Sequence, residues 1–179
     1  RPRKKVTTVH KAPTYKLVCG MFAEECHKMA KEFPDCTIED VLVDSFALKP
    51  ALKPQQFDVV VTTNLFGDIL TDEGAALVGG LGLAPGLCVG ERQAMAQATH
   101  GSAPDIAGKG LANPYAMVMS GKMLLEWLGR KHGESRAVQA ARLIDAAMDR
   151  IIAEQKFVTG DLGGTASTSQ MGDAVVAAL

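Results

Sequence analysis

Two hydrophobic patterns alternate along the chain. Short runs rich in β-branched residues predict strands at 6–10, 40–44, 57–63 and 86–90. The run at 57–63 (FDVVVTT) is continuously β-branched in its middle, so we expect a strand that is buried on both faces. The run at 40–44 (DVLVD) is expected to end in Asp44.

Longer segments repeat apolar residues at three- and four-residue steps, the period of an α-helix. They predict helices over 15–33, 46–53, 68–78, 114–128, 135–152 and 168–178. The helix that Asn113 caps is apolar nearly all round, which is typical of a helix buried deep or at a subunit interface, and Gly129 is expected to end it. Segments 99–114 and 159–168 are expected to be loops. Strands that alternate with helices predict an α/β fold.

Composition narrows the classes of function. The chain has 179 residues, 47% of them hydrophobic and 22% charged, which is ordinary for a globular protein. Its net charge of −1 gives no general attraction to nucleic acid or to membrane surfaces. The basic cluster at 1–5 (RPRKK) is short, and we interpret it as a solvated end. The sequence has no run of 18 apolar residues, so no membrane span is expected.

The four cysteines form no C-x-x-C pair and have no histidines at zinc-finger spacing. We interpret them as reduced and mostly buried thiols. Together with the lack of a secretory signal pattern, they favour a cytoplasmic location. A mitochondrial location is the alternative, because the first predicted strand begins only five residues after the start and we expect the chain to be part of a longer protein.

Three aspartates point to chemistry. Asp68 and Asp72 are four residues apart, so they share one face of the predicted helix. One interpretation is a solvated pair near the helix N-terminus, where negative charge is favoured. The other is a binding site for Mg²⁺ or Mn²⁺, because both residues closely follow a buried strand and Asp44 ends another strand.

The sequence contains neither the G-x-G-x-x-G fingerprint after a strand nor a Walker-A string. The loop at 99–114 is nevertheless unusual. His100 offers two ring nitrogens, and Gly101 and Ser102 offer accessible backbone amides. Asp105 is suited to accept hydrogen bonds from a ribose diol and to repel an added 2′-phosphate. Taken singly, His100 is interpreted as a structural histidine and Asp105 as a turn residue.

Three segments resemble one family. The stretch TTNLFGDILTDEGAALVGGLGLAPG (62–86) resembles the metal-binding signature of the β-decarboxylating dehydrogenases, which act on isocitrate, homoisocitrate, 3-isopropylmalate or tartrate. ATHGSAPDIAGKGLANP (98–114) resembles their coenzyme loop. VHKAP (9–13) resembles the strand that carries their catalytic lysine. The resemblance covers the whole chain but only about the second half of a family member.

The resemblance implies a non-Rossmann α/β fold, of which the chain forms about half of a two-domain subunit. Residues 1–45 would belong to the small, dimer-forming domain and residues 46–179 to the large domain that binds coenzyme and metal. Members of this family are dimers or higher oligomers with shared active sites. Their small-molecule substrate is a 2-hydroxy acid with a carboxylate on the adjacent carbon.

The resemblance also implies roles for individual residues. Asp68 and Asp72 would bind Mg²⁺ or Mn²⁺ from one subunit, and Asp44 would bind it from the partner subunit. Lys11, also from the partner, would serve in proton transfer. The residues implied to line the adenosine end of the coenzyme are His100, Gly101, Ser102, Ala103, Asp105, Ile106 and Asn113. The acid at position 105 favours NAD over NADP.

One residue departs from the pattern of the family. Pro13 stands where the family usually has an asparagine near the nicotinamide, and proline offers neither an amide side chain nor an N–H group. We expect an NAD-dependent dehydrogenase for isocitrate or homoisocitrate, with 3-isopropylmalate and tartrate as alternatives. A non-catalytic regulatory subunit of the same fold is the rival hypothesis. The chain alone is expected to be inactive, because substrate-binding residues of the family lie in its first half.

Overall fold

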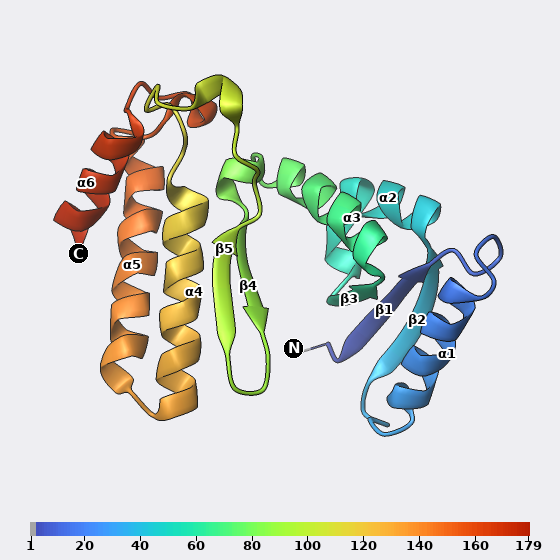
Figure 1. Cartoon of the computed structure of the whole chain (residues 1–179). Helices are drawn as coiled ribbons and strands as arrows, with labels where there is room; N and C mark the ends of the chain where they lie inside the picture. The colour runs from blue at the N-terminus through green and yellow to red at the C-terminus, as the bar shows by residue number, and fades with distance from the viewer. Residues whose placement is uncertain (1–2) are drawn as a thin grey trace. The chain divides into compact units, whose positions relative to one another are not determined.

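The structure is a computed structural model that describes residues 3–179, so the first two residues of the basic cluster lie outside it. The chain divides into two compact units, Arg1–Leu77 and Val78–Leu179 (Figure 1). Each unit has its own hydrophobic core. The expected assignment of residues 1–45 and 46–179 to the two domains of the family stays a prediction.

The first unit is a parallel α/β layer. Its elements are β1 (Lys5–His10), α1 (Val18–Ala30), β2 (Thr37–Leu42), α2 (Val43–Leu52), a 3-10 turn (Pro54–Gln56), β3 (Val59–Thr62) and α3 (Asn64–Leu77). The sheet has the order β2-β1-β3, with both pairs parallel. His10 lies opposite Leu42, and Val9 lies opposite Thr62. The carboxyl ends of all three strands therefore meet at one edge of the sheet.

The middle strand is the most buried one, which corrects the expectation for residues 57–63. Thr7, Thr8 and Val9 of β1 have no exposed surface. Val59 and Val60 of β3 are 37% and 38% exposed, because β3 is an edge strand of this sheet. A β-branched run indicates a strand but does not say whether it lies in the centre or at the edge of the sheet.

The sequence predicted that Asp44 ends a strand, and this prediction is wrong. Strand β2 ends at Leu42, and α2 begins at Val43 with Asp44 in its first turn. A negative charge is favoured at that position by the partial positive charge of the helix N-terminus. The helix α3 also begins earlier than expected, at Asn64, so that Gly67 lies inside the helix.

The core of the first unit joins the sheet to α2. Val9, Val41 and Phe46 form a buried cluster, and Phe57 and Leu70 pack against it. The rings of Phe46 and Phe57 are tilted with centroids 4.8 Å apart, a favourable arrangement for aromatic pairs. Burying side chains of this size contributes about 1.5–3 kcal/mol each. This packing fixes the start of α2, and with it the position of Asp44, against the end of β1.

The second unit combines a β-hairpin with three helices. Its elements are a 3-10 turn (Leu81–Leu83), β4 (Pro85–Val89), β5 (Ala94–Ala98), a 3-10 turn (Pro104–Ile106), α4 (Tyr115–His132), α5 (Ser135–Glu154), a 3-10 turn (Gly160–Leu162) and α6 (Thr168–Ala178). Strand β5 was not predicted from the sequence. Its sequence, AMAQA, lacks the β-branched residues that indicate a strand, and the strand forms by antiparallel pairing with β4.

Helix α4 passes through Gly129, the residue expected to end it. It continues to His132 and closes on Gly133, which has a left-handed φ of 71°. Gly129 is needed for close packing instead. A Cβ atom there would lie 2.6 Å from Val138 Cγ2 and 2.9 Å from the Glu134 carbonyl oxygen at the start of α5. The glycine thus lets the two helices approach each other.

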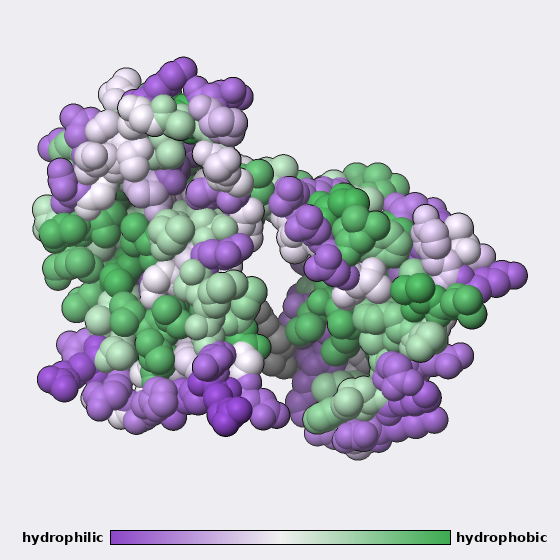
Figure 2. All heavy atoms as spheres, in the orientation of Figure 1, coloured by the Kyte–Doolittle hydropathy of each residue, from purple (hydrophilic) through white to green (hydrophobic). Residues whose placement is uncertain are grey.

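The second core lies between α5, α6 and the loop that joins them. Met148, Ile151, Val158, Met171 and Val175 form its buried cluster. Helix α6 begins with a capping box, in which Ser167 and Gln170 satisfy each other's backbone N–H groups. On the face shown in Figure 2, hydrophobic atoms also gather over the middle of α4 and α5, while the turn between these helices is hydrophilic.

Two further expectations concern the surface. Within residues 3–179, no helix is both long and apolar enough to cross a membrane. All four cysteines are free thiols, but only Cys19 is buried, whereas Cys26 and Cys36 are half-buried and Cys88 is exposed. The expectation that most of them are buried is therefore wrong. Burial raises the pKa of the Cys26 thiol, which keeps it protonated and unreactive at neutral pH.

Candidate functional site

Lys11 and Asp44 form an ion pair at the carboxyl edge of the sheet. Lys11 follows β1 directly, and its Nζ atom lies 2.9 Å from Asp44 Oδ1 in the first turn of α2. The Lys11 side chain is 26% exposed and that of Asp44 is 64% exposed. The hydrogen bond from Lys11 lowers the pKa of Asp44, helped by the backbone N–H groups of Asp44 and Ser45. Asp44 is therefore ionised at neutral pH, as a metal ligand must be.

Asp68 and Asp72 lie on α3, where the sequence placed them. Both are exposed, and the i, i+4 spacing puts them on one face of the helix. The first turn of α3 contains no acidic residue, because the helix starts at Asn64. Among the described residues, no cation lies within ion-pairing distance of either carboxylate. Both carboxylates are available to an external ligand.

The chemistry of these carboxylates fits a hard divalent cation, but one chain supplies only part of a site. Carboxylate oxygens are preferred ligands of Mg²⁺ and Mn²⁺. Over residues 3–179, no three His, Cys, Asp or Glu side chains come together closely enough to hold a metal ion. Asp44 therefore does not join Asp68 and Asp72 within one chain. Its assignment to the site of a partner subunit remains a prediction.

The predicted coenzyme loop follows β5 in the second unit. Residues His100 to Asp105 are exposed, and a short 3-10 turn (Pro104–Ile106) follows Ala103, whose φ of 43° is left-handed. The Nδ1 atom of His100 lies 2.9 Å from the Gly101 carbonyl oxygen. A carbonyl only accepts, so Nδ1 carries the proton, and Nε2 of the neutral ring is left free as an acceptor. A Cβ atom at Gly101 would meet nothing within 4 Å, so the backbone is open to a ligand.

Asn113 differs from the rest of the loop because it is 8% exposed. Its Oδ1 atom accepts the N–H of Tyr115, the first residue of α4, at 2.9 Å, although the N-cap residue of this helix is Pro114 and not Asn113 as predicted. Its Nδ2 atom donates to Asp161 Oδ2 at 2.9 Å, and Thr159 Oγ1 donates to Asp161 Oδ1 at 2.5 Å. Thr168 adds a second connection, because its N–H donates to the Gly110 carbonyl at 2.8 Å. The loop at 159–168 thus braces the end of the predicted coenzyme loop.

The sequence as a whole matches a known protein family. A sequence profile of the isocitrate/isopropylmalate dehydrogenase family matches residues 1–175. The chain belongs to this family. The membership confirms the predicted family and its α/β fold. The relatives reported below are named as dehydrogenases.

Individual members of the isocitrate/isopropylmalate dehydrogenase family are similar to this chain over nearly its whole length. The isocitrate/homoisocitrate dehydrogenase of Thermus thermophilus is 46% identical over 179 residues, covering 100% of this chain and 51% of that protein. The 3-isopropylmalate dehydrogenase of Archaeoglobus fulgidus is 44% identical over 177 residues, covering 99% and 52%. The crystal structure of isocitrate dehydrogenase from Methylococcus capsulatus matches with a TM-score of 0.91 at 47% identity, covering 99% and 51%. The chain spans about half the length of these relatives.

Two polar groups near the predicted site residues were not predicted from the sequence. Asp161 holds Asn113 across 48 residues of chain. His10, next to Lys11, has an Nδ1 atom 3.2 Å from the backbone nitrogen of Ala12. The sequence signal for Asp161 was its place in the glycine-rich loop at 159–168. That of His10 was its place in the VHKAP segment.

Proposed function

We propose that this chain forms part of an NAD- and Mg²⁺- or Mn²⁺-dependent decarboxylating dehydrogenase. The substrate is a 2-hydroxy acid with a carboxylate on the adjacent carbon, and isocitrate or homoisocitrate is the best candidate. 3-Isopropylmalate and tartrate are the alternatives. The observation that carries the proposal is the Lys11–Asp44 pair, 2.9 Å apart, in a chain that belongs to this family.

The pair has a chemical use in such a reaction. Lys11 bears an ammonium group that exchanges protons with substrate atoms close to the metal ligands, which is the role of a general acid or base. Its charge keeps Asp44 ionised. Asp68 and Asp72 would hold the cation together with Asp44 of the partner subunit. When bound, the cation would stabilise negative charge on the substrate oxygen, and NAD would accept the hydride.

The coenzyme loop suits the adenosine end of NAD. His100 offers its free Nε2 atom as an acceptor, and Gly101 lets the ligand approach the backbone. Asp105 offers a carboxylate for ribose hydroxyl groups and would repel the 2′-phosphate of NADP. Ser102, Ala103, Ile106 and Asn113 complete the proposed lining.

We propose a homodimer or a higher oligomer with shared sites. Two features support this. The metal ligands are incomplete within one chain among the described residues. Large apolar side chains on α2 and α3 also lie open, with Leu48 at 61%, Leu65 at 65% and Ile69 at 60% exposure. Exposed apolar surface of this extent is typical of interfaces.

The metal assignment is tested by linked stabilisation. The complete enzyme, meaning this chain together with the half of the fold that its relatives have in addition, should be stabilised by Mg²⁺ by about 2.7 kcal/mol at 100 times the dissociation constant. Asp68→Asn should abolish this stabilisation and NADH formation with isocitrate. Glu73→Gln removes an equal charge from another face of α3 and is the matched control. Equal Mg²⁺ stabilisation of both variants would show the assignment to be wrong.

A regulatory subunit is the second candidate. Pro13 favours it, because proline lacks the amide side chain that the family usually has near the nicotinamide. The turn after Lys11 does not need an N–H at position 13, because Thr14 and Tyr15 donate to the Lys11 carbonyl at 3.0 and 2.8 Å. Proline is thus tolerated there by the fold, whatever the function. Turnover of a panel of 2-hydroxy acids by the complete enzyme separates the candidates. Metal binding without any turnover would favour the regulatory subunit.

A further inference from the structure

His10 holds the peptide group that connects Lys11 to Ala12. The Ala12 N–H donates to His10 Nδ1 at 3.2 Å. The carbonyl of the same peptide group, which belongs to Lys11, accepts from the N–H groups of Thr14 and Tyr15. The group is therefore held at both of its polar ends. Fixing this peptide plane fixes the backbone on the carboxyl side of Lys11, and with it the direction in which the side chain leaves the chain.

The His10 ring is itself fixed by its surroundings. It is 7% exposed and lies at the end of the central strand β1. Because Nδ1 accepts an N–H, the proton of the neutral ring is on Nε2. Nε2 is buried without a hydrogen-bond partner among the described residues and lies 3.7 Å from Asp40 Oδ1. The carboxylate of Asp40 thus faces the protonated side of the ring and favours this tautomer.

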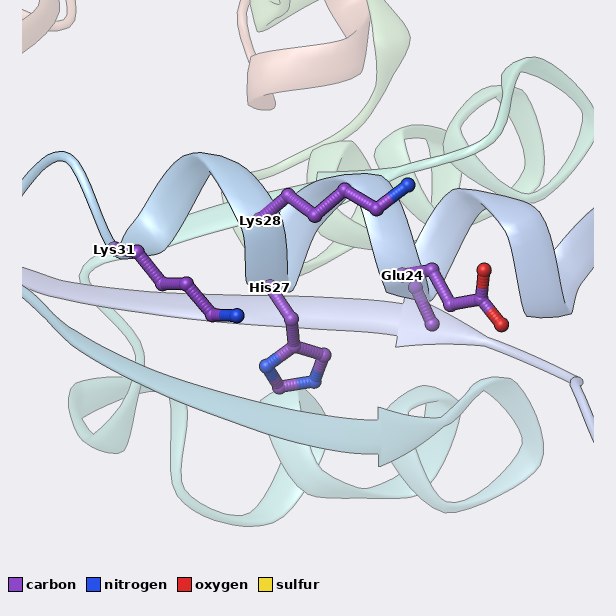
Figure 3. Close-up of a pocket in the computed structure, with 5 residues that line it drawn as sticks. Glu24, His27, Lys28 and Lys31 are labelled. Atoms are coloured by element: carbon purple, nitrogen blue, oxygen red, sulfur yellow. The ribbon is translucent and has the colours of Figure 1, made fainter.

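Asp40 is held in turn from α1. The Nε2 atom of His27 lies 2.8 Å from Asp40 Oδ2. Figure 3 shows His27 extending from the helix toward the strands, while the Lys28 side chain runs along the helix. The connection runs from α1 through Asp40 on β2 to His10 on β1. It ends at the peptide group that orients Lys11.

We propose that His10 is a positioning residue, whose Nδ1 atom aims the Lys11 ammonium at the carboxylate of Asp44 by holding the Ala12 amide. The inference rests on the proposed function in that Lys11 is taken to transfer protons. It goes beyond that function because it assigns a role to a residue that touches neither substrate nor coenzyme. The proposal concerns one atom, since only a hydrogen-bond acceptor at the position of Nδ1 can hold the Ala12 N–H.

Two substitutions separate this atom from the rest of the ring. His10→Asn keeps an acceptor, because an asparagine oxygen bonds the N–H two residues ahead in an Asx-turn. His10→Phe keeps an apolar ring without an acceptor. In the complete enzyme, we expect kcat to fall about 10- to 100-fold in His10→Phe, with both KM values nearly unchanged, since a small misplacement of a reacting group has effects of this size. We expect His10→Asn to restore most of kcat.

A double-mutant cycle tests whether His10 acts through Lys11. In a Lys11→Met background, His10→Phe should cause no further loss of kcat, whereas a purely structural role would give the same loss in both backgrounds. His10→Gln, which carries its polar atoms farther from the backbone, serves as a second variant if His10→Phe does not fold. It should lose kcat as His10→Phe does.

Amide hydrogen exchange at Ala12 gives a readout independent of activity. Exchange should be faster in His10→Phe than in the native protein and close to native in His10→Asn. Native exchange in His10→Phe, equal kcat losses in the Asn and Phe variants, or additive losses in the cycle would each overturn the proposal. If Lys11→Met alone leaves kcat unchanged, the proposed function of Lys11 fails, and exchange at Ala12 still decides whether His10 holds the turn.

Discussion

The contact between Asp161 and Asn113 makes the end of the predicted coenzyme loop sensitive to one carboxylate. Asp161 accepts two hydrogen bonds, from Asn113 Nδ2 at 2.9 Å and from Thr159 Oγ1 at 2.5 Å. Asn113 is 8% exposed and Thr159 is fully buried. Asp161→Ala removes both acceptors and leaves two buried donors without a partner. A buried donor left unpaired costs about 1–3 kcal/mol.

The two contributions share one carboxylate, so they do not add in full. We expect Asp161→Ala to lower the free energy of unfolding of the second unit by about 2–4 kcal/mol. Asp161→Asn is the matched variant, because its single amide oxygen serves only one of the two donors. Its loss should be about half as large. The same variants should weaken NAD binding in the complete enzyme in the same order.

Trp127 provides the assay. It is the single tryptophan of the chain and lies on α4, whose first residue donates its N–H to Asn113, so its fluorescence reports unfolding of the second unit. With a urea m-value of about 2 kcal/mol/M, the expected loss moves the midpoint of Asp161→Ala down by about 1–2 M. A midpoint within about 0.2 M of the native value at that m-value would refute the reasoning, because it would mean that the two donors find other partners at no cost.

Three other predictions follow from single contacts. Gly129→Ala should destabilise the second unit by about 1–3 kcal/mol through overpacking, whereas Gly121→Ala, which meets nothing within 4 Å in the same helix, should stabilise it by about 0.5–1 kcal/mol in urea unfolding. Lys5 lies 2.9 Å from Glu39 and lowers the pKa of that carboxyl, so the stabilisation is present above the unfolded pKa and is lost as pH falls through the folded pKa. Glu39→Gln should cost at most about 1 kcal/mol at pH 7, and the cost should vanish once the pH lies below the folded pKa. Asp105→Arg should lower the ratio of kcat/KM for NAD to that for NADP, and an unchanged ratio would count against Asp105 as the discriminating residue.

The sequence predicted most elements because their patterns are local. The helices over 135–152 and 168–178 were found nearly at their true bounds, since each has a clear apolar stripe. The strand at 6–10 was found because its β-branched residues are also a local signal. Strand β5 was missed because its alanines carry no strand preference, and only the hairpin with β4 makes it a strand.

The sequence offered acidic residues for a predicted site but did not indicate the groups that hold the other predicted residues in place. Hydrogen bonds such as that of Asp161 to Asn113 join residues 48 positions apart, and no spacing rule indicates them. The error at Asp44 had another cause. The strand pattern of β2 runs smoothly into the apolar start of α2, and the boundary is set by the packing of Phe46, which periodicity does not show.

The start of α3 at Asn64 bears on whether Asp68 and Asp72 are a solvated pair or a metal site. The solvated alternative depended on a helix N-terminus that favours negative charge. Because α3 begins at Asn64, Asp68 and Asp72 lie beyond its first turn, and the favourable effect of the helix end fades within that turn. Their mutual repulsion, about 0.2–0.5 kcal/mol at this spacing, is then left without compensation from the helix. The solvated alternative therefore loses the support of the helix end, and binding of Mg²⁺ or Mn²⁺ by the two carboxylates stays a prediction.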